Sequence, residues 1–313
     1  MPEQSAPARA LVVGEALVDV VLRPGAEPAE HPGGSPANVA IGLGRLGREV
    51  GLLTWLAGDA YGDLVREHLA GSGVAVLTGD TAPDRTPVAR AHLDGDGVAT
   101  YEFDLTWDLP ARWDEGDGDP VVVHTGSIAT VIEPGGDAVA RLLADRRGAS
   151  TLTYDPNLRP ALMGSPERTL PVVERLVALA DVVKVSDEDL AWLHPGVPPV
   201  EIARDWLGRG PALVVVTLGG EGALAVTAAG DEVAVTAPPV QVADTVGAGD
   251  SFMAALIDGL WSADLLGADA RERLRAIDRP TVERVLVRCA QVAAITVSRA
   301  GANPPTRAEL GEA

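Results

Sequence analysis

The sequence is poor in cysteine and in long apolar runs, and each shortage excludes a class of protein. Cys289 is the single cysteine in 313 residues, so no disulfide can form within the chain. Together with the lack of a secretory signal at the N-terminus, this favours a reducing cytoplasm. No apolar run approaches the roughly 18 residues of a membrane span. The sequence is therefore typical of a cytoplasmic globular protein with no membrane partner.

Positive charge is also scarce. The chain carries 25 Lys and Arg against 45 Asp and Glu, a formal net charge of −20 at pH 7. This balance opposes non-specific binding to nucleic acid, so we expect no nucleic-acid partner. A phosphate-bearing ligand stays open, because backbone amides and Mg²⁺ can hold phosphates on an acidic protein. Lys184 is the only lysine, which suggests a position that rejects arginine.

Short apolar strands alternate with amphipathic helices along most of the chain. The order runs β, α, β, α, β over residues 8–78 and resumes after residue 120, which predicts an α/β fold with a mostly parallel sheet covered by helices on both faces. Strands are predicted over 8–14, 50–57, 74–78, 121–126, 151–155, 181–186, 212–219, 222–227 and 232–237. Helices are predicted over 36–47, 62–73, 134–147, 167–180, 186–193, 200–209, 249–261 and 281–299.

Residues 86–103 depart from this alternation. Two runs of alternating polarity flank DGDG (94–97), a pattern typical of an antiparallel hairpin. A further extended piece over 18–24 is a strand that can pair with the hairpin. We therefore expect a small sheet that stands off the main domain.

GLGRLG (42–47) matches the dinucleotide motif G-x-G-x-x-G literally, but its glycines lie inside a helical pattern instead of between a strand and a helix. Close helix packing explains them better. The sequence has no P-loop motif, and its five histidines show no zinc-ligand spacing. These observations exclude three common kinds of nucleotide or metal site.

PGGSPAN (32–38) is a stronger candidate for a binding loop. Two glycines ahead of a helix let the backbone approach a ligand, and Asn38 offers both donor and acceptor groups to hydroxyls. A plain helix N-terminal loop explains the same residues equally well.

DTVGAGDSF (244–252) places glycines and acids where a helix begins. Unpaired N–H groups and the positive end of the helix dipole favour an anion there, and glycines let it come close. Asp250 then lies in the first helical turn, where it can take a proton from a hydroxyl that attacks a phosphate. A helix-capping aspartate is the competing interpretation, and spacing alone leaves both open.

DTVGAGDSF resembles the C-terminal signature of ribokinase-like, PfkB-type carbohydrate kinases, and GGSPANVAIGLGRLG (33–47) resembles their N-terminal signature. The two lie about 200 residues apart in the expected order, and the resemblance covers essentially the whole chain. It implies an ATP-dependent sugar kinase with a ribokinase-like core and a small β lid. The implied lid spans 17–32 and 86–110, and the core spans 1–16, 33–85 and 111–313.

The same resemblance implies roles for the residues around the second signature. Asp250 would be the catalytic base, and the amides of Gly247, Ala248 and Gly249 would form the anion hole for the γ-phosphate. Asp244, with Val246 beside it, matches a monovalent-cation position, which implies dependence on K⁺. SRAGAN (298–303) resembles the tail whose carbonyls share that cation, around Thr296, Arg299 and Gly301.

Two further segments resemble the nucleotide side of the family. VTLGGEG (216–222) resembles the nucleotide loop, which places Thr217, Gly219 and Gly222 near ATP. KVSDEDL (184–190) resembles the segment that usually carries N-x-x-E. Ser186 stands for the asparagine, and the shorter Asp189 stands for the glutamate, so we expect Asp189 to reach Mg²⁺ through a water molecule. Lys184 either approaches the ATP phosphates or is a surface lysine.

GEALVD (14–19) and DPNLRP (155–160) look most like fructokinases within the family. They imply that Asp19, with Gly34 and Asn38, binds sugar hydroxyls and that Asn157 and Arg159 line the pocket. A strand-end turn is the competing explanation for Asn157 and Arg159.

D-fructose, phosphorylated at a primary hydroxyl, is the first substrate expected. A 2-keto-3-deoxygluconate kinase is the alternative, although its acidic substrate needs cationic partners and only Arg159 offers itself. A nucleoside kinase and a catalytically idle sugar- or nucleotide-binding regulator also stay open. We further expect a homodimer formed through the lid.

Overall fold

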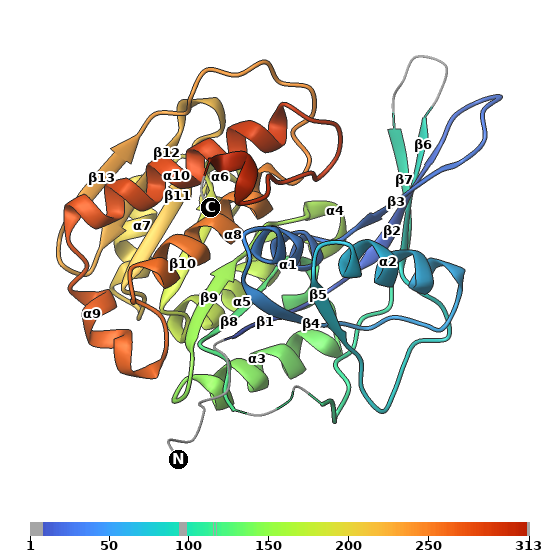
Figure 1. The fold of residues 1–313 in the computed structure, drawn as a ribbon, viewed down its shortest axis with the longest axis horizontal. Helices are drawn as coiled ribbons and strands as arrows, with labels where there is room; N and C mark the ends of the chain where they lie inside the picture. The colour runs from blue at the N-terminus through green and yellow to red at the C-terminus, as the bar shows by residue number, and fades with distance from the viewer. Residues whose placement is uncertain (1–8, 94–98, 115, 117, 312–313) are drawn as a thin grey trace.

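The structure is a computed structural model that describes residues 9–93, 99–114, 116 and 118–311. Within these residues a nine-stranded sheet runs in the order β13-β12-β11-β10-β9-β8-β1-β4-β5 (Figure 1). All neighbouring strands from β11 to β5 in this order pair in parallel, whereas β12 pairs antiparallel with both β11 and β13. The predicted mostly parallel sheet is therefore confirmed. Its strands are β1 Arg9–Val13, β4 Glu49–Leu53, β5 Val74–Leu77, β8 Val122–Gly126, β9 Thr151–Asp155, β10 Val182–Ser186, β11 Leu213–Thr217, β12 Ala223–Thr227 and β13 Glu232–Val235.

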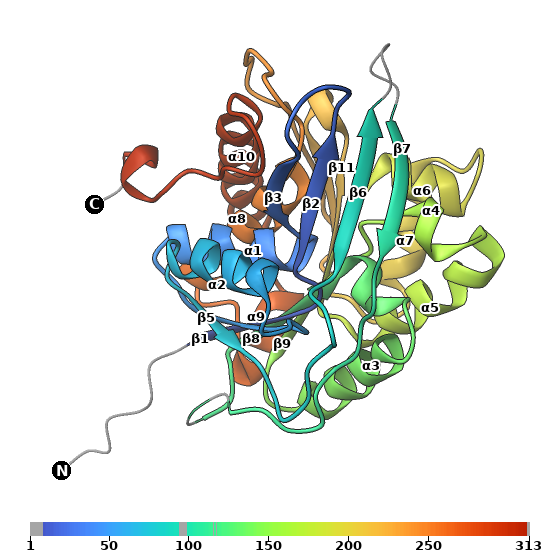
Figure 2. The ribbon, with the colours of Figure 1, turned by 90° about the vertical axis from the view of Figure 1, so that its right-hand side faces the viewer.

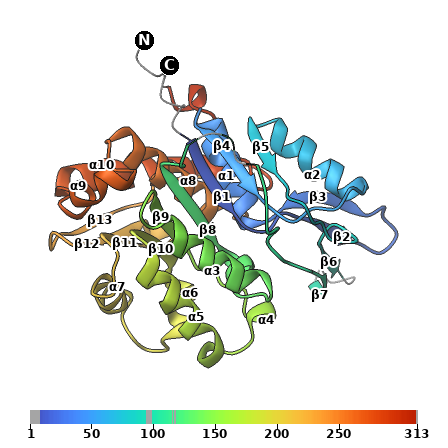
Figure 3. The same cartoon turned by 90° about the horizontal axis from the view of Figure 1, so that it is seen from below.

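Helices cover both faces of this sheet (Figure 3). Side chains alternate along each strand, so Val12 packs with the first group of helices and Val13 with the second. The first group is α1 Ser35–Arg45, α2 Ala60–Ala70, α8 Ala248–Ser262, α9 Arg271–Arg275 and α10 Arg279–Val297. The second group is α3 Gly135–Arg146, α4 Pro160–Met163, α5 Pro166–Leu179, α6 Asp187–Leu193 and α7 Pro199–Leu207.

The predicted helices are all present, with ends shifted by no more than three residues. The short α4 and α9 were not predicted, because one or two turns carry too few residues to show a helical period. Among the described residues, no helix is both long and apolar enough to cross a membrane.

A second sheet, in the order β3-β2-β6-β7, stands off the core (Figures 1 and 2). Its strands are β2 Leu17–Leu22, β3 Ala29–Gly33, β6 Val88–Leu93 and β7 Ala99–Asp104. The antiparallel hairpin of β6 and β7 and its pairing with β2 confirm the prediction, whereas β3 was missed. The predicted DGDG turn (94–97) lies outside the described residues.

Among its described residues, only the end of this small sheet where β2 and β6 begin packs on the core, through one of its faces. Val18, Val20 and Val88 are buried in the same cluster as Val65 of α2. Because strand side chains alternate, Asp19 lies on the opposite face of the sheet.

The glycines of GLGRLG serve helix packing, as predicted. A Cβ on Gly42 would lie 2.5 Å from the Cβ of Ala254 in α8, and a Cβ on Gly44 would lie 2.1 Å from the carbonyl oxygen of Ser72. Helices α1 and α8 can therefore approach closely, and this brings the two signatures of the sequence side by side.

The carboxyl ends of the parallel strands meet at one edge of the large sheet. The chain order of neighbouring strands reverses between β1 and β8, and ligands of open α/β sheets gather outside the carboxyl ends at such a reversal. The residues that follow these strands include Glu15, Ser127, Asn157, Asp189 and Gly219.

Candidate active site

Helix α8 begins where the sequence predicted an anion site. Gly247 precedes it in the left-handed conformation, with φ 75°, and a Cβ there would lie 2.6 Å from the Cβ of Ala302. A side chain at this position would therefore be strained and obstructed. Gly247, Ala248 and Gly249 occupy the positions whose backbone amides begin the helix.

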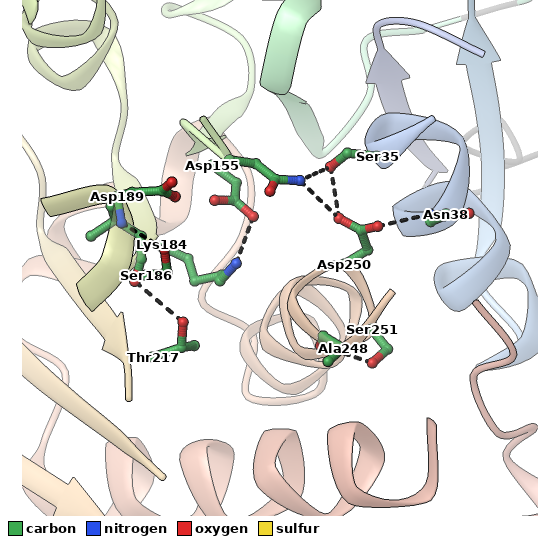
Figure 4. Close-up of polar contacts among 12 residues, drawn as sticks. Ser35, Asn38, Asp155, Lys184, Ser186, Asp189, Thr217, Ala248, Asp250 and Ser251 are labelled. Atoms are coloured by element: carbon green, nitrogen blue, oxygen red, sulfur yellow. Dashed lines mark hydrogen bonds and ion pairs between the residues drawn. The ribbon is translucent and has the colours of Figure 1, made fainter. Parts of the chain in front are cut away.

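Asp250 lies in the first turn of α8 and is 6% exposed. Ser35 Oγ donates a hydrogen bond to its Oδ1 at 2.7 Å, and Asn38 Nδ2 donates to its Oδ2 at 2.8 Å (Figure 4). Asn157 Nδ2 also donates to Oδ1, at 3.3 Å. The carboxylate thus reaches across to α1, and no side chain caps α8, so the helix-capping interpretation of Asp250 is wrong.

Burial raises the pKa of Asp250, and the hydrogen bonds from Ser35 and Asn38 oppose that rise. Asp155 raises the same pKa further through its negative charge, whereas Lys184 lowers it. The result is a desolvated carboxylate whose ionised form is held by three donors, a suitable environment for a general base.

Ser35 is a site residue that the sequence analysis missed. It opens α1, three residues before Asn38, and residues at this spacing share a helix face. That spacing to Asn38 was the available signal, but the hydroxyl gave no sign of its partner on a helix some 200 residues away along the chain.

Lys184 forms a buried ion pair beside the start of α8. It is 3% exposed, and its Nζ lies 2.7 Å from Asp155 Oδ2. A Cβ on Gly249 would lie 3.0 Å from this Nζ. The surface-lysine alternative is therefore wrong. Its ammonium group lies next to the predicted anion hole.

Asp155 and Asp189 form an acidic pair near Lys184. Asp155 Oδ1 is buried and has no hydrogen-bond partner among the described residues. Burial, followed by the negative charge of Asp155, raises the pKa of Asp189 to about 6, while Lys184 opposes the rise. Leu158 N donates to Asp189 Oδ1 at 3.1 Å.

An unpartnered carboxylate oxygen beside a second acid fits a hard divalent cation. No group of three or more potential metal ligands occurs within the described part of the chain. The donor set therefore suits Mg²⁺, which keeps several waters and takes its remaining ligands from phosphates, better than a cation enclosed by protein.

The predicted nucleotide loop follows β11. Thr217 ends this strand, and Gly219 has φ 53° with no atom within 4 Å of a Cβ placed on it, so its surface is open to a ligand. Gly222 differs, because a Cβ there would lie 2.0 Å from the carbonyl oxygen of Val235. Gly222 is required by the packing of the chain on itself.

On the lid side, Asp19 lies opposite His31 in the sheet, and a Cβ on Gly33 would lie 2.3 Å from Asp19 Oδ2. Asp19 is itself exposed, and desolvation by the protein atoms around it raises its pKa, whereas the charges of His31 and Arg159 oppose the rise. Arg159 therefore acts electrostatically on Asp19. It also donates from Nη1 to Asn157 Oδ1 at 2.8 Å.

Gly34 has φ 107°, and a Cβ on it would lie 2.5 Å from the carbonyl oxygen of Glu15. Only glycine fits between the two segments. The structure thus brings Asn38 and Asn157 together on Asp250, with Gly34 at the start of the helix that carries Asn38.

Glu15, at the reversal of strand order, was also missed. It is 4% exposed, and its Oε2 accepts a hydrogen bond from Ala129 N at 3.1 Å. Trp107 Nε1 donates to the carbonyl oxygen of the same Ala129 at 2.9 Å. Burial raises the pKa of Glu15 to about 7. At neutral pH this buried carboxyl is therefore partly ionised, and its ionised form destabilises the folded state.

In the predicted monovalent-cation segment, the side chains mostly bond to other groups of the protein. Asp244 Oδ1 accepts from Val246 N at 3.0 Å and Oδ2 accepts from Gly301 N at 2.8 Å, and these bonds lower the pKa of Asp244. The side chains of Thr296 and Arg299 bond elsewhere, to the Val292 carbonyl oxygen and to Glu309. The prediction for these two rests on their carbonyl groups.

Comparison with known proteins agrees with this arrangement. Residues 8–309 match the pfkB family carbohydrate kinase group. A fructokinase from Rhizobium leguminosarum bv. trifolii is 37% identical over 270 residues, 82% of this chain and 81% of the relative. A fructokinase from Xylella fastidiosa with bound ATP shares the fold, with a TM-score of 0.81 at 24% identity over 94% of this chain and 93% of that one. A double-mutant fructokinase from Vibrio cholerae O395, solved with fructose, ADP and potassium ion bound, gives a TM-score of 0.78 at 25% identity over 97% of each chain.

Proposed function

The chain belongs to the pfkB family of carbohydrate kinases, and on that premise we propose that it transfers the γ-phosphoryl group of ATP to a primary hydroxyl of D-fructose. The observation that carries the proposal is the buried Asp250 at the start of α8, directly after Gly247 and Gly249 and hydrogen-bonded to Ser35 and Asn38. Fructokinases among the relatives support the choice of sugar.

In the proposed step Asp250 accepts the proton of the sugar hydroxyl as the hydroxyl oxygen bonds to the γ-phosphorus. The bond between that phosphorus and the oxygen bridging to the β-phosphate breaks, which releases ADP. The amides of Gly247, Ala248 and Gly249 would stabilise the charge that develops on the γ-phosphate. Lys184, whose Nζ lies beside Gly249, would add a fixed positive charge to the same place.

The nucleotide and Mg²⁺ would lie at the ends of β10 and β11. Thr217 and Gly219 would approach the phosphates, with Gly222 in the turn that shapes their loop. Mg²⁺ would be held through water by Asp189, next to the free acceptor Asp155 Oδ1. When bound, the ion neutralises phosphate charge.

The sugar would lie between Asp250 and the small sheet. Asp19, Gly34 and Asn38 would bind its hydroxyls from one side, and Asn157 and Arg159 would line the other. The lid, residues 17–32 and 86–110, would close over the sugar and exclude water, which otherwise competes for the γ-phosphate.

Three finer features belong to the same proposal. K⁺ would bind beside the loop from Asp244 to Val246, with the carbonyls of Thr296, Arg299 and Gly301. Two copies of the chain would associate through the lid, whose edge strands β3 and β7 lie at the rim of the small sheet. The enzyme would act in the cytoplasm, where ATP and free sugar are available together.

A coupled ADP-release assay over fructose, ribose, tagatose, 2-keto-3-deoxygluconate and adenosine tests the function. We expect the highest kcat/KM with fructose. A higher value with 2-keto-3-deoxygluconate or adenosine would replace fructose as the substrate. ADP release with none of the five, despite ATP binding, would favour a catalytically idle regulator.

A further inference from the structure

A directed series of hydrogen bonds connects Arg159 to Asp250. Arg159 Nη1 donates to Asn157 Oδ1 at 2.8 Å, Asn157 Nδ2 donates to Ser35 Oγ at 2.6 Å, and Ser35 Oγ donates to Asp250 Oδ1 at 2.7 Å. Each donor points along the series toward the carboxylate. Successive hydrogen bonds of this kind polarise one another, so the donor strength of the Ser35 hydroxyl is increased by the guanidinium at the far end.

The middle of this series is built from constrained positions. Ser35 is 7% exposed, and it follows Gly34, whose φ of 107° sets the direction in which α1 begins. Asn157 has φ 38°, in the left-handed region that asparagine tolerates better than most residues. Arg159 Nη1 also donates to the carbonyl oxygen of Asn157, at 3.1 Å, which fixes that conformation.

The Ser35 hydroxyl does not cap its own helix, α1. It reaches across to α8 instead and donates to Asp250 (Figure 4). It also accepts a hydrogen bond from Asn157.

We propose that Ser35 is a positioning residue for the base: its hydroxyl holds Asp250 in the ionised, correctly oriented state and couples it to the sugar-side pair Asn157 and Arg159. This inference rests on the proposed role of Asp250. Ser35 need not touch the sugar or the phosphate for this. Its effect is on the basicity and orientation of the carboxylate.

Every charged neighbour of Asp250 bears on the expected pH dependence. Among the described residues, Asp155 on β9 disfavours its ionised form and Lys184 on β10 favours it. Ser35 and Asn38 on α1 favour the ionised form by hydrogen bonding, and so does Asn157, which donates to Oδ1 at 3.3 Å. Removing the Ser35 hydroxyl subtracts one favourable interaction and leaves the rest. The pKa of Asp250 should therefore rise, and the acid limb of the pH–rate profile should move to higher pH.

The test compares Ser35→Ala and Ser35→Cys with the parent enzyme. It measures kcat and kcat/KM for the sugar substrate across pH 5 to 9. Ser35→Ala should lower kcat about 10-fold, the order expected for one hydrogen bond to a charged group, and should move the acid limb upward. Ser35→Cys keeps a side chain of similar size but only a weak donor, so it should resemble Ser35→Ala. Ser35→Thr, which keeps the hydroxyl, should restore the limb.

Ser150→Ala is the matched control, because Ser150 is a fully buried serine whose hydroxyl donates to the Pro120 carbonyl oxygen, at 2.6 Å, outside this series. It should leave the acid limb in place. If Ser35→Ala and Ser35→Cys fold and keep the parent pH profile with kcat within about twofold, the positioning role is overturned. Asp250→Asn distinguishes a failure of the proposed function from a failure of this inference. If Asp250→Asn keeps the parent kcat, the assignment of Asp250 as the base fails. If Asp250→Asn loses activity but the Ser35 variants behave like the parent, only the role of Ser35 fails.

Discussion

The Lys184 ammonium lies 2.7 Å from Asp155 Oδ2 and next to Gly249 at the start of α8, where a Cβ would lie 3.0 Å from its Nζ. Both side chains are nearly inaccessible to solvent, with exposures of 4% and 1%. Two charges removed from water stabilise a protein little on balance, and breaking such a pair is costly. A buried pair kept beside the proposed anion site is better explained by function than by stability.

Substitution of Lys184 should affect ATP and folding together. Lys184→Ala leaves Asp155 buried and uncompensated, so we expect a loss of about 3–5 kcal/mol in the free energy of unfolding and a higher KM for ATP. Lys184→Arg should also raise that KM, because the broad guanidinium does not fit the space that holds a compact ammonium beside Gly249. Urea unfolding and steady-state kinetics measure the two effects.

The double variant Lys184→Met with Asp155→Asn is the control, since it removes both charges. Stability should largely recover while the KM for ATP stays high. A parental KM for ATP in all three variants would show that Lys184 serves the fold alone.

Asp250→Asn should keep the fold and ATP binding while lowering kcat by about 10²- to 10⁴-fold, the usual contribution of a positioned base. The amide is nearly isosteric. Its single oxygen can accept from Ser35, whereas its NH₂ group faces Asn38, whose side-chain amide must turn to present its oxygen. Calorimetric ATP binding provides the control measurement. Near-normal kcat would refute the base assignment.

Glu15 should make stability depend on pH in the direction opposite to a salt-bridged acid. Its folded-state pKa is about 7 against a usual value of 4.5, so between these values the folded state binds more protons than the unfolded state. Stability contributed by the protonated form is complete below about pH 4.5 and falls as pH rises toward and past 7.

Glu15→Gln removes the titration and keeps an acceptor for Ala129 N. The variant should be more stable than the parent at pH 8, by an amount on the order of 1–3 kcal/mol, and its stability should vary less between pH 5 and 8. Glu49→Gln, which removes an exposed acid, is the control and should follow the parent. Parallel pH curves for Glu15→Gln and the parent would contradict the prediction.

Sugar binding should protect the lid from hydrogen exchange. The small sheet stands off the core, and closure over a sugar would bury backbone amides that are otherwise accessible. Added fructose should slow exchange in residues 86–93 and 99–103 more than in residues 121–125 of the core. Equal protection of the two regions would argue against closure.

Potassium should activate the enzyme through the Asp244 loop. Replacing all alkali cations with an organic cation should lower the rate. Asp244→Ala should be slow with or without potassium, because the loop that Asp244 ties to Gly301 is released. Asp205→Ala, at an exposed helical position, should respond to potassium like the parent. If the rate of the parent enzyme is the same with and without potassium, potassium has no part in the mechanism.

The sequence alone was sufficient for the architecture and for placing Asp250, the proposed base, in the first turn of a helix. Alternating strands and helices give the parallel sheet because their periods are local properties of the chain. The glycines before Asp250 mark a helix start open to an anion, again through residues adjacent in sequence. The two signatures, about 200 residues apart, then identify the family.

The partners of these residues could not be predicted, because they are set by contacts between elements far apart in the chain. That Ser35 binds Asp250, that Lys184 is buried against Asp155, and that Glu15 holds Ala129 each depend on how helices and strands pack. The strand β3 was missed for a related reason, since its segment AEHPG has no alternating pattern and is extended only through pairing with β2. Local periodicity and glycine placement thus determined the fold and the helix start that carries Asp250. The packing of α1, α8 and the strand ends decided which groups surround Asp250, because burial and hydrogen bonding to distant residues exist only once the chain has folded.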